Sequence, residues 1–142
     1  MISIREIAIG DAEAAARLSG ELGYPVETAV IAERIQRLAS LPDHVVFVAC
    51  QDENVVGWID AGVVYHLQAE ASGEIGGFVV SNGLRSSGIG AALIARAEQW
   101  AKDRGVKRML VRCQINREAA HRFYLREGYG HTKTSAVFVK PL

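Results

Sequence analysis

Apolar and polar positions follow two periods along the chain, the two-residue alternation of strands and the 3.6-residue repeat of helices. Strand-like runs are predicted at four places in the first 80 residues of the chain, which are residues 2–7, 44–51, 55–65 and 74–80. The second and third runs are separated only by residues 52–54 and should form a hairpin. Between the first and second runs, apolar spacing predicts two helices, one capped by Asp11 and one from about Thr28 to before Pro42.

The second half of the chain continues with helical spacing after Gly90, and Gly105 suits the C′ position of that helix. A β-prone run within residues 106–113 follows, and a strand reached through a helix should pair in parallel with residues 74–80. A further helix is expected after Asn116 as its N-cap, with Gly128 at C′, and residues 137–139 predict a final strand. The fold class is therefore mixed α/β, in the order β-α-α-β-β-β-α-β-α-β.

Composition indicates one soluble globular domain over residues 1–142, with 49% hydrophobic and 23% charged residues. Sixteen basic and sixteen acidic side chains give a formal net charge of zero. No bulk field therefore attracts nucleic acid or an anionic membrane, although a local patch stays open. The first residues lack the apolar stretch of a signal peptide, and no run approaches the ~18 apolar residues of a membrane span. A cytoplasmic protein is expected.

The two cysteines, Cys50 and Cys113, both fall in predicted strands. Their spacing is not that of a metal site, so buried free thiols are favoured over a disulfide or a redox role. No metal is expected.

The most informative stretch is the glycine-rich turn that follows the strand at 74–80. Residues 86–91 should lie at a helix N-terminus, where backbone N–H groups have no partner and the helix dipole is positive. Gly88 and Gly90 would let a phosphate approach the backbone, and Arg85 could add a charged contact. Taken alone, the glycine pair favours a tight β–α turn that needs glycine for its geometry only.

Two common phosphate-binding motifs are excluded by what the turn lacks. A Walker-type loop needs Lys and Ser or Thr after its last glycine, where this chain has Ala91 and Ala92. A dinucleotide fingerprint needs a third glycine where Leu93 stands, and an acidic residue about 20 positions further on, where the chain is basic. ATP, GTP and NAD are therefore disfavoured.

The segment Arg85-Ser86-Ser87-Gly88-Ile89-Gly90 matches the pattern Arg/Gln-x-x-Gly-x-Gly/Ala, and with it the chain resembles the GNAT family of acetyl-CoA-dependent N-acetyltransferases. The string from Asn116 to Tyr129 resembles a second family signature, in which Asn is followed by Ala, Phe-Tyr and Gly-Phe/Tyr. The predicted order of elements is also the family's. Three positions depart from it: Asn82 replaces a common proline, and Ser86 and Ser87 replace a glycine and a basic residue.

The resemblance implies acetyl-CoA as co-substrate, bound where the strands at 74–80 and 107–113 splay apart. It places backbone amides near Val79 and Val80 against the cofactor, one of them a candidate oxyanion donor. The serine hydroxyls of the turn could still donate to phosphate. The residues expected to bind the cofactor are Phe78, Val79, Val80, Arg85, Ser86, Ser87, Gly88, Ile89, Gly90, Ala91 and Asn116.

For catalysis, the resemblance assigns Tyr124 as the general acid that serves the leaving thiolate, although helical spacing alone is typical of a core aromatic. Glu74 is the candidate base, acting on the amine through water, with an ordinary solvated strand-end charge as the alternative. His121 shares the helix of Tyr124 but is more typical of a solvated histidine. Tyr24 and Asp60 are candidate acceptor-binding residues, with a packing tyrosine and an outward-facing carboxylate as the alternatives.

The sequence thus predicts an enzyme that moves an acetyl group from acetyl-CoA to a primary amine by direct attack in a ternary complex. The acceptor could be a small molecule or a peptide amine. The alternative function is a non-catalytic acyl-CoA sensor or interaction module. Exposed sheet edges and residues 137–139 also favour a homodimer.

Overall fold

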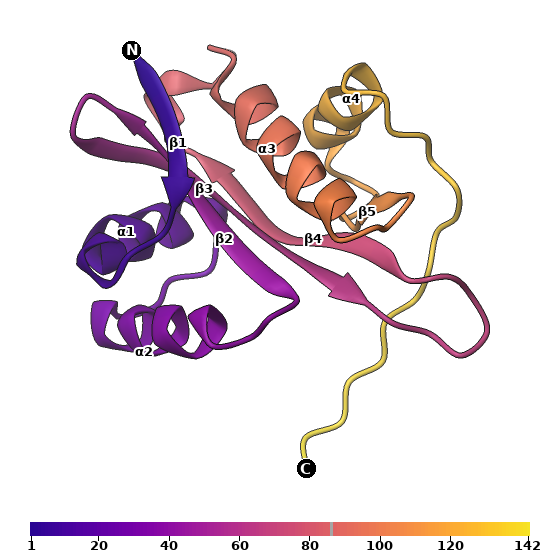
Figure 1. The fold of residues 1–142 in the computed structure, drawn as a ribbon. Coiled ribbons are helices and arrows are strands. Elements are labelled where there is room, and N and C mark those ends of the chain that lie inside the picture. The colour runs from indigo at the N-terminus through magenta and orange to yellow at the C-terminus, as the bar shows by residue number, and fades with distance from the viewer. Residues whose placement is uncertain (86) are drawn as a thin grey trace. The chain divides into compact units, whose positions relative to one another are not determined.

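A computed structural model describes residues 1–85 and 87–142, which form two compact units, residues 1–111 and residues 112–142. The first unit holds a five-stranded sheet in the order β1-β2-β3-β4-β5 (Figure 1). Its strands are β1 (Ile2–Glu6), β2 (His44–Gln51), β3 (Asn54–Val64), β4 (Ser72–Val80) and β5 (Met109–Val111). The four neighbouring pairs are antiparallel except β4 and β5, which run parallel. The predicted mixed α/β class is confirmed.

Three helices cover the sheet of the first unit, with α1 (Ala12–Leu22) and α2 (Thr28–Ala39) on one face and α3 (Ile89–Asp103) on the other (Figure 1). Two neighbouring residues of β2 contact helices on opposite faces of the sheet, because successive side chains of a strand point to opposite faces. Phe47 lies under the guanidinium of Arg96 from α3, at 4.4 Å, whereas Val48 joins the core cluster of Leu18 from α1. Short 3-10 turns precede α1 at Ile9–Asp11 and α3 at Asn82–Leu84.

The N-cap prediction for Asp11 is right in position and wrong in mechanism. Asp11 directly precedes α1, but its side chain makes no capping hydrogen bond to that helix. Its carboxylate instead accepts two hydrogen bonds from the Arg5 guanidinium, at 2.7 and 2.8 Å, and one from the Ala8 amide at 2.8 Å. A charged partner brought close by β1 outcompetes the local amides, because charge-assisted hydrogen bonds are the stronger ones.

Helix and strand boundaries in the first unit otherwise follow the sequence closely. Gly105 follows α3 with φ of 83°, as expected of a C′ residue. Two strands differ in length: β4 begins at Ser72 rather than residue 74, and β5 is limited to three residues within the predicted 106–113.

The second unit contains α4 (Glu118–Arg126) and an extended segment after it. Asn116 is not the N-cap of α4, because the helix begins one residue later and Arg117 occupies that position. Gly128 has φ of 96° and closes the helix as predicted, with the Tyr129 amide donating to the Tyr124 carbonyl at 2.9 Å.

The final strand predicted at residues 137–139 is wrong for this structure. Residues 130–142 carry no helix or strand, and the side chains of Val137, Phe138 and Val139 are 78%, 92% and 86% exposed. β-prone side chains favour a strand only when a neighbouring strand supplies backbone partners and apolar contacts, so propensity alone does not form one.

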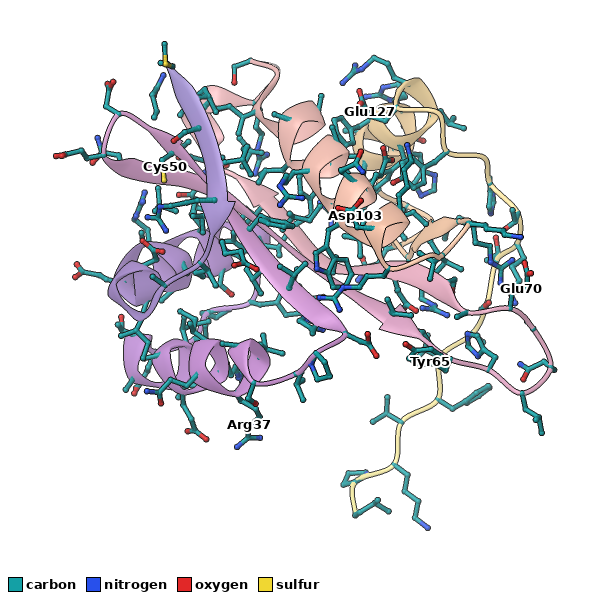
Figure 2. All side chains as sticks on the ribbon, viewed as in Figure 1. Arg37, Cys50, Tyr65, Glu70, Asp103 and Glu127 are labelled. Carbon is teal, nitrogen blue, oxygen red and sulfur yellow. The ribbon has the colours of Figure 1, made fainter. Side chains whose placement is uncertain are left out.

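Both cysteines are free thiols, but the prediction of a buried thiol in a strand is confirmed only for Cys50, because β5 ends at Val111 before Cys113. Cys50 is buried in β2 opposite Ser3 of β1 (Figure 2), whereas Cys113 is half-buried. Among the helices of the described residues, not one is both long and apolar enough to cross a membrane.

Candidate active site

The glycine-rich turn leads into α3 with the geometry of an anion site. Gly88 is the N-cap of α3, in the left-handed conformation at φ of 88°. A glycine has no side chain to accept hydrogen bonds from the first amides of the helix, so those amides and the positive end of the dipole are left for another acceptor. A Cβ at Gly88 would meet nothing within 4 Å, so the backbone is open on that side. Ile89 is buried and anchors the first turn in the core.

Two hydrogen bonds hold the chain at the point where it leaves β4 and enters the turn, one to β3 and one to α1. The Ser81 amide donates to the Val56 carbonyl of β3 at 2.8 Å, and the Asn82 amide donates to Glu21 Oε1 of α1 at 2.8 Å. Arg85 is exposed and directly precedes Ser86, which lies outside the described residues. The Ser87 hydroxyl donates to the Leu84 carbonyl, so its proton is already used. Phosphate would therefore meet the backbone of this serine rather than the hydroxyl donor expected from the sequence.

The strands β4 and β5 separate just before this turn. Their parallel register ends at Ile75 opposite Val111, whereas β4 continues to Val80. Antiparallel strands alternate between pairs that exchange hydrogen bonds and pairs that do not. Since Ser81 donates to β3, the amide of Val80 points away from β3, toward the side on which β5 has ended. Val79 itself is buried in the core, and Phe78 and Val80 are half-buried.

Two predicted site carboxylates, Asp60 and Glu74, lie on the sheet face opposite α3. A Cβ at Gly73 would be 3.2 Å from Ala101 of α3, so the next residue, Glu74, points to the other face. Glu74 pairs with Gly62 of β3, which is two residues from Asp60. Glu74 is half-buried and lies inside β4, between Gly62 and Leu110, rather than at the end of the strand.

Asp60 has a partner that sequence reasoning missed. His44 Nε2 lies 2.5 Å from Asp60 Oδ1, and the two side chains retain 24% and 30% of their area exposed. On the same face, the Trp58 ring covers Gly77, where a Cβ would be 2.8 Å from Cζ3, and its indole N–H donates to the Ala15 carbonyl at 3.3 Å. The adjacent glycines in β4 were the one available signal, because they leave room for these side chains.

Tyr24 occupies the connection between α1 and α2. Its amide donates to the Ser19 carbonyl at 2.9 Å, and its carbonyl accepts the Ser19 hydroxyl at 2.6 Å. The backbone is therefore fixed while the residue remains 66% exposed.

The remaining candidates lie in the second unit and are described within it. Tyr124 is half-buried on α4, with edge-on contacts to Phe123 and Tyr129 at centroid distances of 5.4 and 5.9 Å. Burial raises the pKa of the Tyr124 phenol to about 12, and Cys113 adds to the shift. His121 Nε2 lies 3.0 Å from the Gln114 carbonyl, which ties this histidine to the backbone of its own unit. Asn116 is exposed in the turn before α4.

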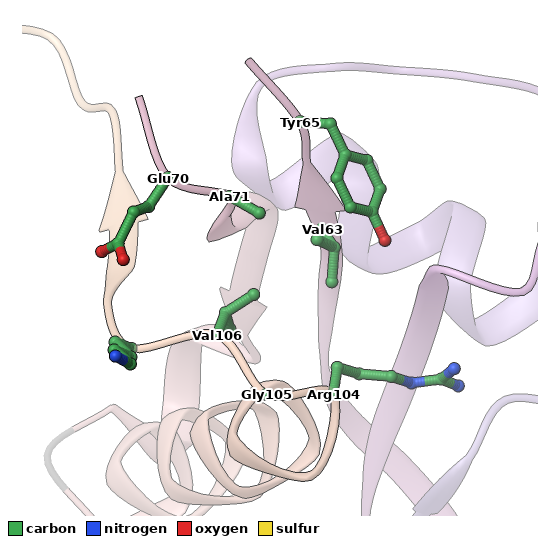
Figure 3. Close-up of a pocket in the computed structure, with 8 residues that line it drawn as sticks. Val63, Tyr65, Glu70, Ala71, Arg104, Gly105 and Val106 are labelled. Atoms are coloured by element: carbon green, nitrogen blue, oxygen red, sulfur yellow. The ribbon is translucent and has the colours of Figure 1, made fainter. Parts of the chain in front are cut away.

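A concavity of about 280 Å³ lies at the opposite end of α3 from the glycine-rich turn (Figure 3). It lies between the β3–β4 connection and the segment after α3, and Tyr65, Glu70 and Arg104 are among its lining residues. A 15-residue helix is about 22 Å long. This hollow is therefore distinct from the turn. Glu70 lines it, a residue that the sequence offers with Asp60 and Glu74 as a candidate carboxylate for an amine acceptor, whereas Asp60 and Glu74 do not.

The sequence was compared with known families and proteins. Residues 11–129 match the sequence model of the Acetyltransferase (GNAT) family. An aminoalkylphosphonate N-acetyltransferase of Salmonella typhimurium is 42% identical over 82 residues, which are 57% of this chain and about half, 53%, of that protein. An aminoglycoside N(6')-acetyltransferase type 1 of Klebsiella aerogenes is 26% identical over 115 residues, covering 79% of this chain and 76% of that protein.

A solved structure shares the fold along the whole chain. It is an aminoglycoside acetyltransferase in complex with a bisubstrate analogue that contains CoA, with a TM-score of 0.88, 17% identity, and coverage of 100% of this chain and 99% of that one. The family match spans most of the chain and includes both predicted signatures, the glycine-rich turn and the segment from Asn116 to Tyr129. The chain therefore belongs to the GNAT family of acetyltransferases.

Proposed function

We propose that this protein transfers an acetyl group from acetyl-CoA to a primary amine of a small molecule. The observation that carries the proposal is the coincidence of two features in the first unit. The first feature is the N-terminus of α3, whose N-cap Gly88 comes eight residues after Val80, the last residue of β4. The second is the edge of β4 beyond Ile75, where its pairing with β5 has ended. One feature suits the phosphates of a cofactor, and the other suits a linear arm that replaces a missing strand.

In this proposal the cofactor phosphates bind the first amides of α3, with Arg85 beside them. The pantetheine arm lies along β4 from Val80 toward Gly76 and brings the thioester to the place where β5 ends. A backbone amide that points away from β3, such as that of Val80, would donate to the arm. Asn116 is proposed to contact the cofactor from the second unit.

The chemistry proceeds by direct attack of the amine in a ternary complex. The neutral amine nitrogen forms a bond to the thioester carbon, the carbon–sulfur bond breaks, and the electron pair leaves on sulfur. Glu74 is the proposed base, which accepts the amine proton through water, since this half-buried residue lies on β4 on the same face of the sheet as Asp60.

Tyr124 is the proposed hydrogen-bond donor to the leaving thiolate. With its pKa raised to about 12, the phenol keeps its proton throughout the working pH range. An ordinary thiol has a pKa of about 8.5 and is the stronger acid. Tyr124 therefore stabilises the thiolate by donating a hydrogen bond, while the proton that neutralises the sulfur is delivered by solvent after release.

The relatives support a small-molecule amine as the acceptor, without indicating which kind of amine. One relative is named for aminoalkylphosphonates, in which an anion accompanies the amine, and the other for aminoglycosides, in which several amines accompany each other. We propose Tyr24 and Asp60 as acceptor contacts. Both units are proposed to act as one catalytic domain, because the family match extends across them.

A non-catalytic acyl-CoA sensor is the second candidate, because it would use the same proposed cofactor site. The two are separated by incubating the protein with acetyl-CoA and an amine library, while free CoA is followed with a thiol reagent. An enzyme releases CoA in proportion to amine and gives a product 42 mass units heavier, about the mass of one acetyl group less a proton. Tight acetyl-CoA binding without turnover on any amine would favour the sensor.

A further inference from the structure

His44 and Asp60 form a pair whose geometry differs from that of an ordinary surface ion pair. His44 Nε2 and Asp60 Oδ1 are 2.5 Å apart, and both atoms are buried although the side chains are partly exposed. The contact is close enough for an ion pair, but it is not aligned as a hydrogen bond, and neither atom has another hydrogen-bond partner among the described residues. One carboxylate oxygen is therefore held against the imidazole, and the exposed part of the side chain lies elsewhere.

The rest of the Asp60 carboxylate lies against Gly76. A Cβ at Gly76 would be 3.0 Å from Oδ2, so any larger residue would crowd the carboxylate. Gly76 is exposed, and it is the first residue of β4 beyond the register with β5. Asp60 thus presents its second oxygen beside the point where the two strands separate.

The His44 ring is held as firmly as its partner. A Cβ at Gly62 would be 2.9 Å from Nδ1, which shows that the imidazole packs on the backbone of this glycine. Gly62 is opposite His44 on one side and opposite Glu74 on the other. Two carboxylates and one imidazole therefore share this part of the face.

Within β2, β3 and β4, the permanently charged side chains all carry a negative charge. The sequences of β2, β3 and β4 contain no lysine or arginine, and their acidic residues are Asp60 and Glu74. A partly exposed carboxylate in such a setting attracts a cation and repels an anion.

We propose that Asp60 selects acceptors carrying a second ammonium group close to the reacting amine, and that His44 is the positioning residue that holds Asp60 for this contact. The inference rests on the proposed acetyl transfer. Asp60 binds a cation other than the reacting amine, because a carboxylate in contact with an amine favours its protonated form, which cannot attack. The acceptor class is accordingly a diamine or polyamine, and an anionic group in that position is disfavoured.

The test compares two acceptors of equal length, 1,3-diaminopropane and 3-aminopropan-1-ol, which differ by one ammonium against one hydroxyl. The ratio of their kcat/KM values measures selection of the second cation. Asp60→Asn should lower this ratio at least tenfold, chiefly through KM for the diamine, because a charged hydrogen bond is replaced by a neutral one of the same shape. The dissociation constant of acetyl-CoA, from calorimetry, should stay unchanged.

Two variants of His44 separate positioning from folding. Gln can place an amide donor near the position of Nε2, so His44→Gln should retain most of the ratio, whereas His44→Leu should lose it as Asp60→Asn does. In the double variant His44→Leu/Asp60→Asn, the ratio should equal that of Asp60→Asn alone. The matched control is Asp43→Asn, which neutralises the carboxylate next to His44 in sequence, where Oδ2 accepts the Tyr65 hydroxyl at 2.8 Å. Its ratio should match the wild type.

The outcomes also distinguish this inference from the proposed function. If the wild type acetylates both acceptors and Asp60→Asn keeps the wild-type ratio, selection by Asp60 is refuted while acetyl transfer stands. If His44→Leu keeps the ratio that Asp60→Asn loses, the positioning role is refuted. If the wild type acetylates no amine in a broad library, the proposed function fails, and the selection of acceptors falls with it.

Discussion

The anion site proposed at α3 can be tested by adding one methyl group at Gly88. Gly88 and Gly105 lie at the two ends of α3, with φ of 88° and 83°, and a Cβ at either would meet nothing within 4 Å. Alanine at either position therefore strains the backbone without a clash. The left-handed conformation costs a residue with a Cβ about 1–2 kcal/mol, and the smaller entropy of the unfolded chain offsets part of it. We expect both variants to lose about 1 kcal/mol of unfolding free energy, or about 4 °C in Tm.

Acetyl-CoA binding should separate the two variants. The methyl group of Gly88→Ala lies where a phosphate must approach the first amides of α3, so the dissociation constant of acetyl-CoA should rise at least tenfold. Gly105→Ala carries the same strain at the far end of the helix and should bind as the wild type does. Isothermal titration of both folded variants measures this. Undiminished affinity in Gly88→Ala, or an equal loss in both, would refute the phosphate site at this turn.

Four further outcomes are expected. Tyr124→Phe should lower kcat at least tenfold with little change in acetyl-CoA affinity, and an unchanged kcat with chemistry rate-limiting would return this tyrosine to packing. Glu74→Gln should lose activity mainly on the acidic limb of the pH–rate profile, and a uniform loss would contradict a base. Asp11→Asn should lower the unfolding free energy by about 1–2 kcal/mol at pH 7 in urea titrations. Light scattering at micromolar concentration should show a homodimer, and a monomer would remove that prediction.

The pH dependence expected of Asp11→Asn has a definite sign. Hydrogen bonds from Arg5 lower the pKa of Asp11 below its usual value, so the pair stabilises the fold above that value and is lost as the pH falls through the folded-state pKa. The difference between wild type and variant should therefore be full at pH 7 and shrink below about pH 4. A difference that persisted at pH 2 would mean that packing, not charge, is responsible.

Local signals in the sequence identified most of the elements. Gly88, Gly105 and Gly128 were each predicted at a helix end, and each has a positive φ that other residues rarely adopt. The fold and the glycine-rich turn could be predicted because each depends on a few neighbouring residues. Asp11 shows the limit of such reasoning, since the choice between capping α1 and binding Arg5 depends on where β1 places the guanidinium.

Contacts between distant segments lay beyond that reasoning. His44 and Asp60 are 16 positions apart, and their contact depends on the register of β2 with β3. The Asn82 amide is held by Glu21, 61 residues earlier. No spacing rule in one sequence selects such partners.

The shared face of Asp60 and Glu74 depends on one extra residue in β4. Asp60 pairs with Gly77 and Ala61 pairs with Ile75, so Gly76 is a bulge residue without a place in the β3 register. With strict alternation, Glu74 would fall on the face opposite Asp60, beneath α3, because a slip of one residue reverses every side chain. The bulge restores Glu74 to the face of Asp60 and at the same time lets Ile75 remain in the core at 4% exposure. The two carboxylates therefore share one face because of Gly76, beside which the Asp60 carboxylate lies, at the residue where β4 leaves β5.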